Sequence, residues 1–251
     1  MTAFIVLAIL AYIGYRYSKR GARRKTGWRF FGPAYVPGHG GPYAPPTTRA
    51  SQRGEAGEAA VHAELHRVLT WLCADDFHLH DGPVLIEHAP GTAFPTAEID
   101  HLAVTPFGIF VIETKNWTGR IAHGAGYDDL DVIRPDGTRE TRRSPLAQNR
   151  TKVAFLNEKL PRLWRIEGLG VFAAAACTLD RDLPPTLLHV SELAYFLRMR
   201  RHEFLRSGQK PVNVKTAWGA IMLNASISTT KLEEHVKRLR ENPKVCPVGV
   251  E

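Results

Sequence analysis

Cysteine is scarce in this chain of 251 residues, which holds only Cys73, Cys177 and Cys246. The three are widely spaced, odd in number and form no Cys-x-x-Cys pair, so the sequence offers neither a disulfide framework nor a zinc site. The glycine-rich loops of nucleotide-binding proteins, the nucleophile elbow of α/β-hydrolases and internal repeats are also missing. The composition therefore favours a cytosolic globular body with reduced thiols.

Acidic residues are absent from positions 1–53, which hold nine Lys or Arg. The rest of the chain carries 24 Lys or Arg against 25 Asp or Glu, so the N-terminal segment supplies the whole formal net charge of +8. The remainder is therefore not a uniformly cationic nucleic-acid-binding domain. Its length suits one domain with a sizeable core.

Long hydrophobic runs are limited to residues 3–15, which are uncharged and followed at once by basic residues. A bilayer span needs about 17–25 residues, so this run is short unless Tyr15, Arg16 and Tyr17 reach the headgroups. The charge follows the run and no cleavage site is visible, which disfavours a secretory signal. We predict a transmembrane helix at 1–18 in a single-pass protein of the inner or cell membrane, with the body in the cytoplasm. A cleaved signal and an interfacial or core helix are the alternatives.

Residues 19–53 are rich in Gly, Pro and basic side chains, which predicts an extended linker. Its aromatic residues favour a belt at the membrane surface, with stacking on nucleic acid as the alternative. They are Trp28, Phe30, Phe31, Tyr35 and Tyr43.

Two β-rich runs, 99–104 and 109–114, flank a Thr-Pro-Phe-Gly turn at 105–108. We expect a hairpin in which Val104 lies opposite Ile109. Counting outward from this pair sets the register of the whole hairpin, because side chains alternate between the two faces of a strand.

That register places Asp100 directly opposite Glu113, with Cβ atoms about 4.5–5.5 Å apart. Lys115 falls on the same face as Glu113, and His101 faces away from Asp100. Two carboxylates this close repel unless a cation lies between them. A hard divalent ion held by oxygen ligands and an ion pair with Lys115 that closes the end of a sheet are the two interpretations.

A helix is expected from Gly57, because apolar residues recur at helical spacing along one stripe. They are Val61, Leu65, Val68, Leu69 and Leu72. Glu58 falls within this stripe, where it either complements the helix dipole or reaches Asp100 and Glu113 as a third acid.

Ser144 and Pro145 predict the start of a further helix. Its expected apolar side consists of Leu146, Val153, Leu156 and Leu160, and its opposite side of Gln148, Lys152, Phe155 and Lys159. Basic residues in and before this helix are candidates for phosphate contacts, or else they form an ordinary solvated surface. The candidates are Arg142, Arg143, Arg150 and Lys152.

Other expected elements are a β segment over 78–90 broken near Gly82 and a strand pair within 122–140. Residues 170–177 fit a buried strand or a helix. A strand at 187–190 and helices at 191–205 and 231–241 complete the pattern.

Several runs carry a family resemblance. They are Gly54–Glu58, Glu98–His101 and Gly108–Trp117, with Gly119, Pro145 and Gln148. Over about 54–155 the chain resembles the NERD (nuclease-related) domain of the PD-(D/E)xK nuclease-like superfamily. Ile99, rather than Pro, precedes Asp100, so the superfamily motif is matched in role and not in letters.

The alternation of strands and helices predicts an α/β fold, and the resemblance implies a restriction-endonuclease-like mixed central sheet flanked by helices. It further implies a NERD-like nuclease core at 54–165 and a C-terminal α/β extension of the same domain at 166–251.

The resemblance also implies a site in which Asp100 and Glu113, assisted by Glu58, hold Mg²⁺ (or Mn²⁺). Lys115 would act at the phosphate, and Gln148 would orient the substrate or a metal-bound water. The expected function is that of a membrane-anchored nuclease cleaving nucleic acid, DNA being favoured over RNA. A catalytically inactive, membrane-tethered nucleic-acid-binding or assembly module is the main alternative, and a membrane scaffold that binds no nucleic acid is a weaker one.

Overall fold

A computed structural model describes residues 49–241 of the chain. The predicted anchor at 1–18 and nearly all of the predicted linker at 19–53 lie outside the described residues. Within the described part, none of the helices is both long and apolar enough to cross a membrane.

A five-stranded mixed sheet lies at the centre of the fold, in the order β1-β4-β5-β9-β11. The first three strands are antiparallel neighbours, whereas β5, β9 and β11 run parallel. The strands are β1 (His78–Leu79), β4 (His101–Thr105), β5 (Gly108–Lys115), β9 (Ile166–Phe172) and β11 (Leu187–His189). The prediction of a mixed central sheet in an α/β fold is therefore confirmed.

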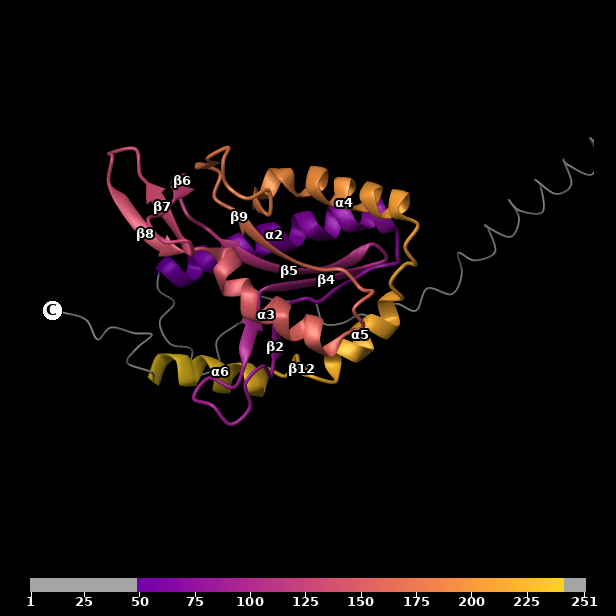
Figure 1. Ribbon diagram of the computed structural model, residues 1–251. Helices are drawn as coiled ribbons and strands as arrows, with labels where there is room; N and C mark the ends of the chain where they lie inside the picture. The colour runs from indigo at the N-terminus through magenta and orange to yellow at the C-terminus, as the bar shows by residue number, and fades with distance from the viewer. Residues whose placement is uncertain (1–48, 242–251) are drawn as a thin grey trace, which may run out of the picture. The chain divides into compact units, whose positions relative to one another are not determined.

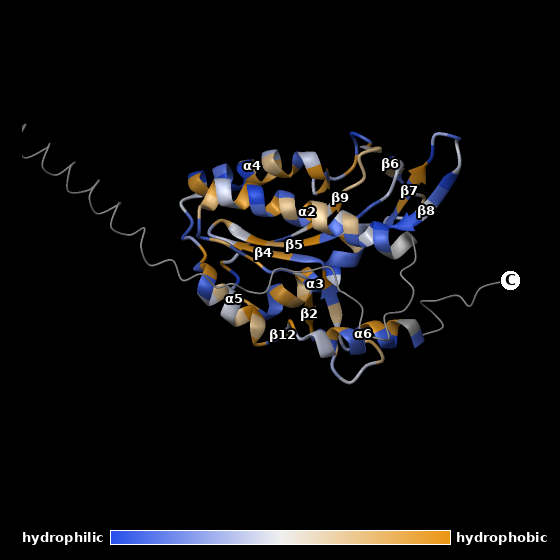
Figure 2. Cartoon of the chain, turned by 180° about the vertical axis from the view of Figure 1, so that it is seen from behind, coloured by the Kyte–Doolittle hydropathy of each residue, from blue (hydrophilic) through white to orange (hydrophobic). Residues whose placement is uncertain are grey.

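Helices cover both faces of this sheet (Figure 1). On one face lie α2 (Arg49–Cys73) and α4 (Leu193–Ser207), which pack on Phe110 and Ile112 of β5. On the other lie α3 (Pro145–Lys159) and α5 (Val214–Met222), which pack on Ile109 and Val111. Figure 2 shows the apolar strands β4 and β5 between these two helical layers. Burial on both faces explains why β5 is a nearly continuous apolar run.

Two smaller sheets flank the centre, and most of their pairing was not predicted. One has the order β10-β6-β7-β8, and the other the order β12-β2-β3. Their strands are β6 (Gly119–His123), β7 (Asp129–Ile133), β8 (Arg139–Arg143), β10 (Cys177–Leu179), β2 (Val84–Ile86), β3 (Ala97–Ile99) and β12 (Ala225–Ser226). The expected strand pair within 122–140 is present as β7 and β8, and the short helix η2 (Val190–Glu192) and α6 (Thr229–Glu241) complete the described chain.

The predicted start of the first helix at Gly57 is wrong, because α2 already begins at Arg49. Gly57 lies in the helix interior, where an added Cβ would approach the Cβ of Asn116 to 2.9 Å. The glycine therefore permits close packing of α2 against the segment that follows β5. Residues 170–177 also differ from the expectation, since β9 starts at Ile166 and ends before the alanines.

Candidate active site

The β4–β5 hairpin has the predicted register, with Val104 paired to Ile109. Its turn is tighter than predicted, because Thr105 still pairs with Gly108. The paired residues end at His101 and Ile112.

Asp100 follows this last pair, in the bend between β3 and β4, at the end of the hairpin where Glu113 lies. Its Oδ2 accepts a hydrogen bond from the backbone N–H of Thr114 at 2.7 Å. That bond orients the carboxyl group beside the end of β5.

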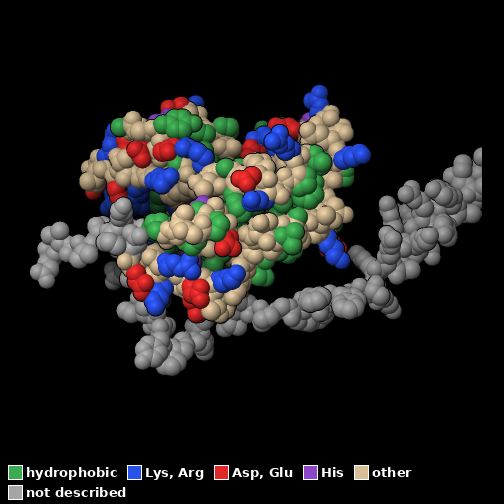
Figure 3. All heavy atoms as spheres, turned by 60° about the horizontal axis from the view of Figure 1, so that its bottom comes forward, with side chains coloured by type: hydrophobic (Ala, Val, Ile, Leu, Met, Phe, Trp, Pro, Cys, Tyr) green, Lys and Arg blue, Asp and Glu red, His purple; other side chains and the backbone are tan. Residues whose placement is uncertain are grey.

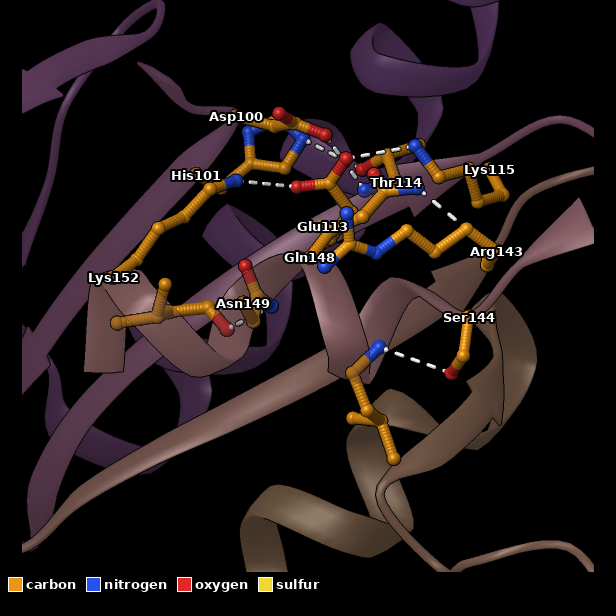
Figure 4. Close-up of polar contacts among 12 residues, drawn as sticks. Asp100, His101, Glu113, Thr114, Lys115, Arg143, Ser144, Gln148, Asn149 and Lys152 are labelled. Atoms are coloured by element: carbon orange, nitrogen blue, oxygen red, sulfur yellow. Dashed lines mark hydrogen bonds and ion pairs between the residues drawn. The ribbon is translucent and has the colours of Figure 1, made fainter. Parts of the chain in front are cut away.

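Glu113 is buried between two lysines, which approach it from opposite sides (Figure 4). Lys115 Nζ lies 2.7 Å from Oε1, and Lys152 Nζ lies 2.5 Å from Oε2. Burial alone would raise the pKa of Glu113, but the two ammonium groups outweigh it and hold the pKa below its ordinary value. Glu113 is therefore the charged centre of the site.

Lys152 is not on the solvent side of α3, where the helical pattern had placed it. Its side chain is 9% exposed, and α3 buries Phe155 on the same side. Asn149, one turn earlier, donates from Nδ2 to the backbone carbonyls of Val111 at 3.0 Å and Leu169 at 2.9 Å. These bonds attach α3 to both β5 and β9 and turn Lys152 toward Glu113. The sequence contains one indication that α3 is rotated in this way, because the side of the helix that was expected to face solvent includes the apolar Phe155.

Two further acids line the same cavity, Glu58 on α2 and Glu98 on β3. Partial burial, followed by the charges of Asp100 and Glu98, raises the pKa of Glu58 to about 7. Burial and then Glu113 raise the pKa of Asp100 to about 6, and burial also raises the pKa of Glu98. Glu98 was missed by the sequence analysis, although its position two residues before Asp100 placed it close to the predicted cluster.

The cavity has a volume of about 770 Å³ and lies between α2, the end of β5, the β7–β8 hairpin and α6. Four carboxylates and the two lysines are among the residues that line it. Trp117, Arg134 and Arg142 line the same cavity. The acid cluster therefore shares its cavity with an aromatic ring and two arginines.

The remaining predicted site residues are scattered. Arg142 lines the cavity, whereas Gln148, Arg143 and Arg150 are not among the described residues that do so. Gln148 Nε2 donates a long hydrogen bond of 3.5 Å to the carbonyl of Arg143. Arg150 pairs with Asp128 at the surface.

Behind the acids, on the α2 side of β5, the buried His101 contacts Thr114. The distance from His101 Nε2 to Thr114 Oγ1 is 3.1 Å. Burial lowers the pKa of His101 to about 3, so its ring is neutral at physiological pH. His101 therefore supports the strand that carries Glu113 and brings no charge to the cluster.

Among the described residues, no group of three or more His, Cys, Asp and Glu side chains is arranged to hold a metal ion. The donor chemistry nevertheless fits a hard divalent cation, since the cavity gathers carboxylate oxygens. Four carboxylates against two ammonium groups leave a formal charge of −2 in the cluster. Burial is the largest cause of the raised pKa values of Glu58, Glu98 and Asp100, and nearby carboxylates raise them further. For Glu113 to bind a metal ion, Lys115 or Lys152 would have to give up its ion pair with one of the two carboxylate oxygens of Glu113.

A helix-flanked mixed sheet that bears acids and lysine at the end of a central hairpin is consistent with a PD-(D/E)xK-like nuclease domain. The family model NERD, described as nuclease-related domain, matches residues 53–173. This stretch, which runs from α2 past the end of β9 and contains the acid cluster and both lysines, is therefore similar to the nuclease-related domain. The recognition made from the sequence motifs is confirmed. Neither the curated proteins nor the solved structures contain a match to the chain.

Proposed function

We propose that this protein hydrolyses nucleic-acid phosphodiesters with the help of a divalent metal, Mg²⁺ or Mn²⁺, at the acid cluster. The main support is the excess of carboxylates around Glu113, which lie within a nuclease-related domain and in a cavity of about 770 Å³. Strongly perturbed carboxyl groups in a cleft are typical of functional sites.

The positions of the residues suggest a separate role for each of them. Asp100, Glu113 and Glu58 are the proposed metal ligands, and the Thr114 N–H keeps Asp100 oriented. Lys115, which is partly exposed beside Glu113, is placed to stabilise negative charge that develops on a phosphate. When bound, the metal would supply a water of lowered pKa near the phosphate.

Lys152 holds Glu113 in place through their buried ion pair. A role of Gln148 in orienting the substrate stays a prediction, as do phosphate contacts by Arg142, Arg143 and Arg150.

The decisive experiment is a cleavage assay on single- and double-stranded DNA and RNA with and without Mg²⁺. We expect metal-dependent cleavage, faster on DNA than on RNA. Replacing Glu113 by Gln should lower the rate by about a thousandfold or more, because a metal ligand and the centre of the cluster are lost. The matched control is Glu167→Gln, a strand glutamate at the far end of β9, which should leave the rate within about twofold. Equal rates for the wild type and Glu113→Gln would refute the proposal.

One observation favours a non-catalytic alternative. Both carboxylate oxygens of Glu113 already bind lysine ammonium groups, which compete with a metal ion for the same ligand. The protein would then be a nucleic-acid-binding or assembly module that keeps the acidic cluster without turnover. Calorimetry that detects no Mg²⁺ or Mn²⁺ binding, together with salt-sensitive DNA binding, would establish this alternative.

Membrane attachment is a separate part of the proposal and is supported only by the apolar run at 3–15 and the basic residues after it. Fractionation of cells that express the full chain should place it with the membranes. A variant that lacks residues 1–18 should move to the soluble fraction, and recovery of both forms in the same fraction would contradict the anchor.

A further inference from the structure

We propose that Trp117, Arg134 and Arg142 form a second subsite that binds an unpaired nucleotide next to the acid cluster, so that the protein selects single-stranded nucleic acid. The inference depends on the proposed function only for the position of the reacting phosphate. It adds the class of strand that this site accepts and the residues that select it.

Trp117 is placed for this role by the end of β5. It follows Lys115 by two residues, which is at most about 7 Å of extended backbone. Its indole packs edge-on against the buried Phe172, with ring centroids 5.6 Å apart. The ring is thus held in position while it lines the same cavity as Lys115.

Arg142 lies over this ring, with its guanidinium carbon 5.0 Å from the indole centroid. An indole and a guanidinium group both offer flat surfaces on which bases stack, and such stacking tolerates any base. The pair therefore forms a ready stacking platform at the edge of the acid cluster.

A single carboxylate now bridges the two arginines. Glu140 accepts two bonds of 2.8 Å from Arg142 and one of 3.2 Å from Arg134, so the trio keeps a net charge of +1. The Glu140 side chain is 45% exposed, and ion pairs this exposed contribute little to stability. Guanidinium groups that hold a carboxylate through two bonds suit a phosphate equally well. A backbone phosphate would thus take the place of Glu140.

The charges on one face of the molecule and the geometry of base stacking both favour a single strand over a duplex. On the face shown in Figure 3, basic and acidic side chains are interspersed and form no broad basic surface such as a duplex binder uses. The cavity, at about 770 Å³, has room for a nucleotide beside a reacting phosphate. A base inside a duplex reaches an indole only after it has been unpaired and unstacked, which costs free energy. Stacking on Trp117 therefore favours strands whose bases are already free.

The test measures binding by fluorescence anisotropy with a labelled single-stranded oligonucleotide and with its blunt duplex, in EDTA so that no cleavage occurs. Trp117→Ala should weaken binding of the single strand by about tenfold and change binding of the duplex by less than about twofold. Trp117→Phe, which keeps an aromatic ring against Phe172, should retain most of the affinity. The matched control is Trp71→Ala, an exposed tryptophan on α2 outside the cavity, which should bind like the wild type.

Variants that change the charge at the two arginines provide an independent test of the subsite. Arg142→Gln should weaken single-strand binding and reduce the slope of log K against log salt by about 0.7. Glu140→Gln should tighten binding and steepen that slope, because both arginines are released. If Trp117→Ala does not fold, the Glu140→Gln result decides, and unchanged binding overturns the subsite.

Equal single-strand affinity for Trp117→Ala and Trp71→Ala also overturns it, as does an equal loss on the duplex. These failures are separate from failure of the proposed function. A protein that cleaves nucleic acid while Trp117→Ala binds normally lacks the subsite but keeps the hydrolysis. A protein that never cleaves but loses single-strand binding in Trp117→Ala keeps the subsite and lacks the hydrolysis.

Discussion

The two ends of the parallel strand pair β5 and β9 carry opposite kinds of charge cluster. At the end where β9 begins, Glu167 pairs with Arg200 at 2.7 Å, and Arg165 and Glu203 complete a group of two acids and two bases. At the end where β5 finishes, Glu113 and three further carboxylates gather around two lysines, and the arginines that line the same cavity form no ion pair with these acids among the described residues. The same sheet thus carries a balanced cluster and an unbalanced one.

We interpret the balanced cluster as structural charge and the unbalanced cluster as the charge of the proposed site. Each charge in the balanced cluster has an opposite partner, so the group is complete without a ligand. Burial, followed by the neighbouring carboxylates, raises the pKa values of Asp100 and Glu58 in the unbalanced cluster, which means that these carboxyl groups are held in a place that opposes their ionisation. Such an arrangement opposes stability at neutral pH and is typical of functional sites.

The largest expected effect is on the unbalanced end, where Lys152→Met should lower the free energy of unfolding by about 3–5 kcal/mol. The substitution removes one partner of a buried ion pair and leaves Glu113 with Lys115 alone. Urea denaturation measures the effect. The double variant Lys152→Met/Glu113→Gln should recover part of the loss, because the neutral Gln no longer adds a buried negative charge that a single lysine must balance.

The control for this prediction is Lys159→Met on the same helix. Its side chain is 39% exposed and its ammonium group pairs with an exposed glutamate, so we expect a change below about 1 kcal/mol. If the two lysine variants are equally stable, the ion pair between Lys152 and Glu113 does not support the fold.

A smaller effect is expected from pH. Because the pKa of Asp100 is raised to about 6, the folded protein binds more protons than the unfolded chain between about pH 4 and 6. Its contribution to stability is therefore full below about pH 4 and is lost as the pH rises through 6. In EDTA, the wild type should lose on the order of 1 kcal/mol more than Asp100→Asn between pH 5 and pH 8.

Glu167→Gln serves as the balanced-end control and should follow the wild-type pH dependence. Mg²⁺ should reduce the decline in the wild type, because a bound cation favours the ionised carboxylates. Parallel pH curves for the wild type and Asp100→Asn would contradict the raised pKa.

The smallest effect is expected at the balanced end. Arg165 is 47% exposed and lies 3.4 Å from each of its two glutamate partners. Replacing it by Gln should change the unfolding free energy by less than about 0.5 kcal/mol. A loss of several kcal/mol would show that the balanced cluster, too, depends on each of its charges.

Signals from residues close together in the sequence predict part of the candidate site. The Thr-Pro-Phe-Gly turn and strand alternation correctly predict the pairing of Val104 with Ile109, and the pairing carries Asp100 to the end of the hairpin where Glu113 lies. The Ser144 cap and Pro145 likewise predict where α3 begins. The signals for these features lie within a few residues of one another.

The partners of Glu113 were predictable only in part. Lys115 follows from alternation along one strand, but Lys152 depends on the rotation of α3. That rotation is set by Asn149, whose amide bonds to Val111 and Leu169 on two different strands. No local pattern encodes contacts between residues so far apart in the chain.

The sequence by itself therefore determined the central hairpin, its register and the acids that the register gathers, because turns and side-chain alternation are short-range properties. Only the tertiary structure decided that a second lysine neutralises Glu113, that Glu98 joins the cluster and that Trp117 and Arg142 share its cavity. These features arise where separate elements pack together, and packing selects among helix rotations that the helical pattern alone leaves equivalent.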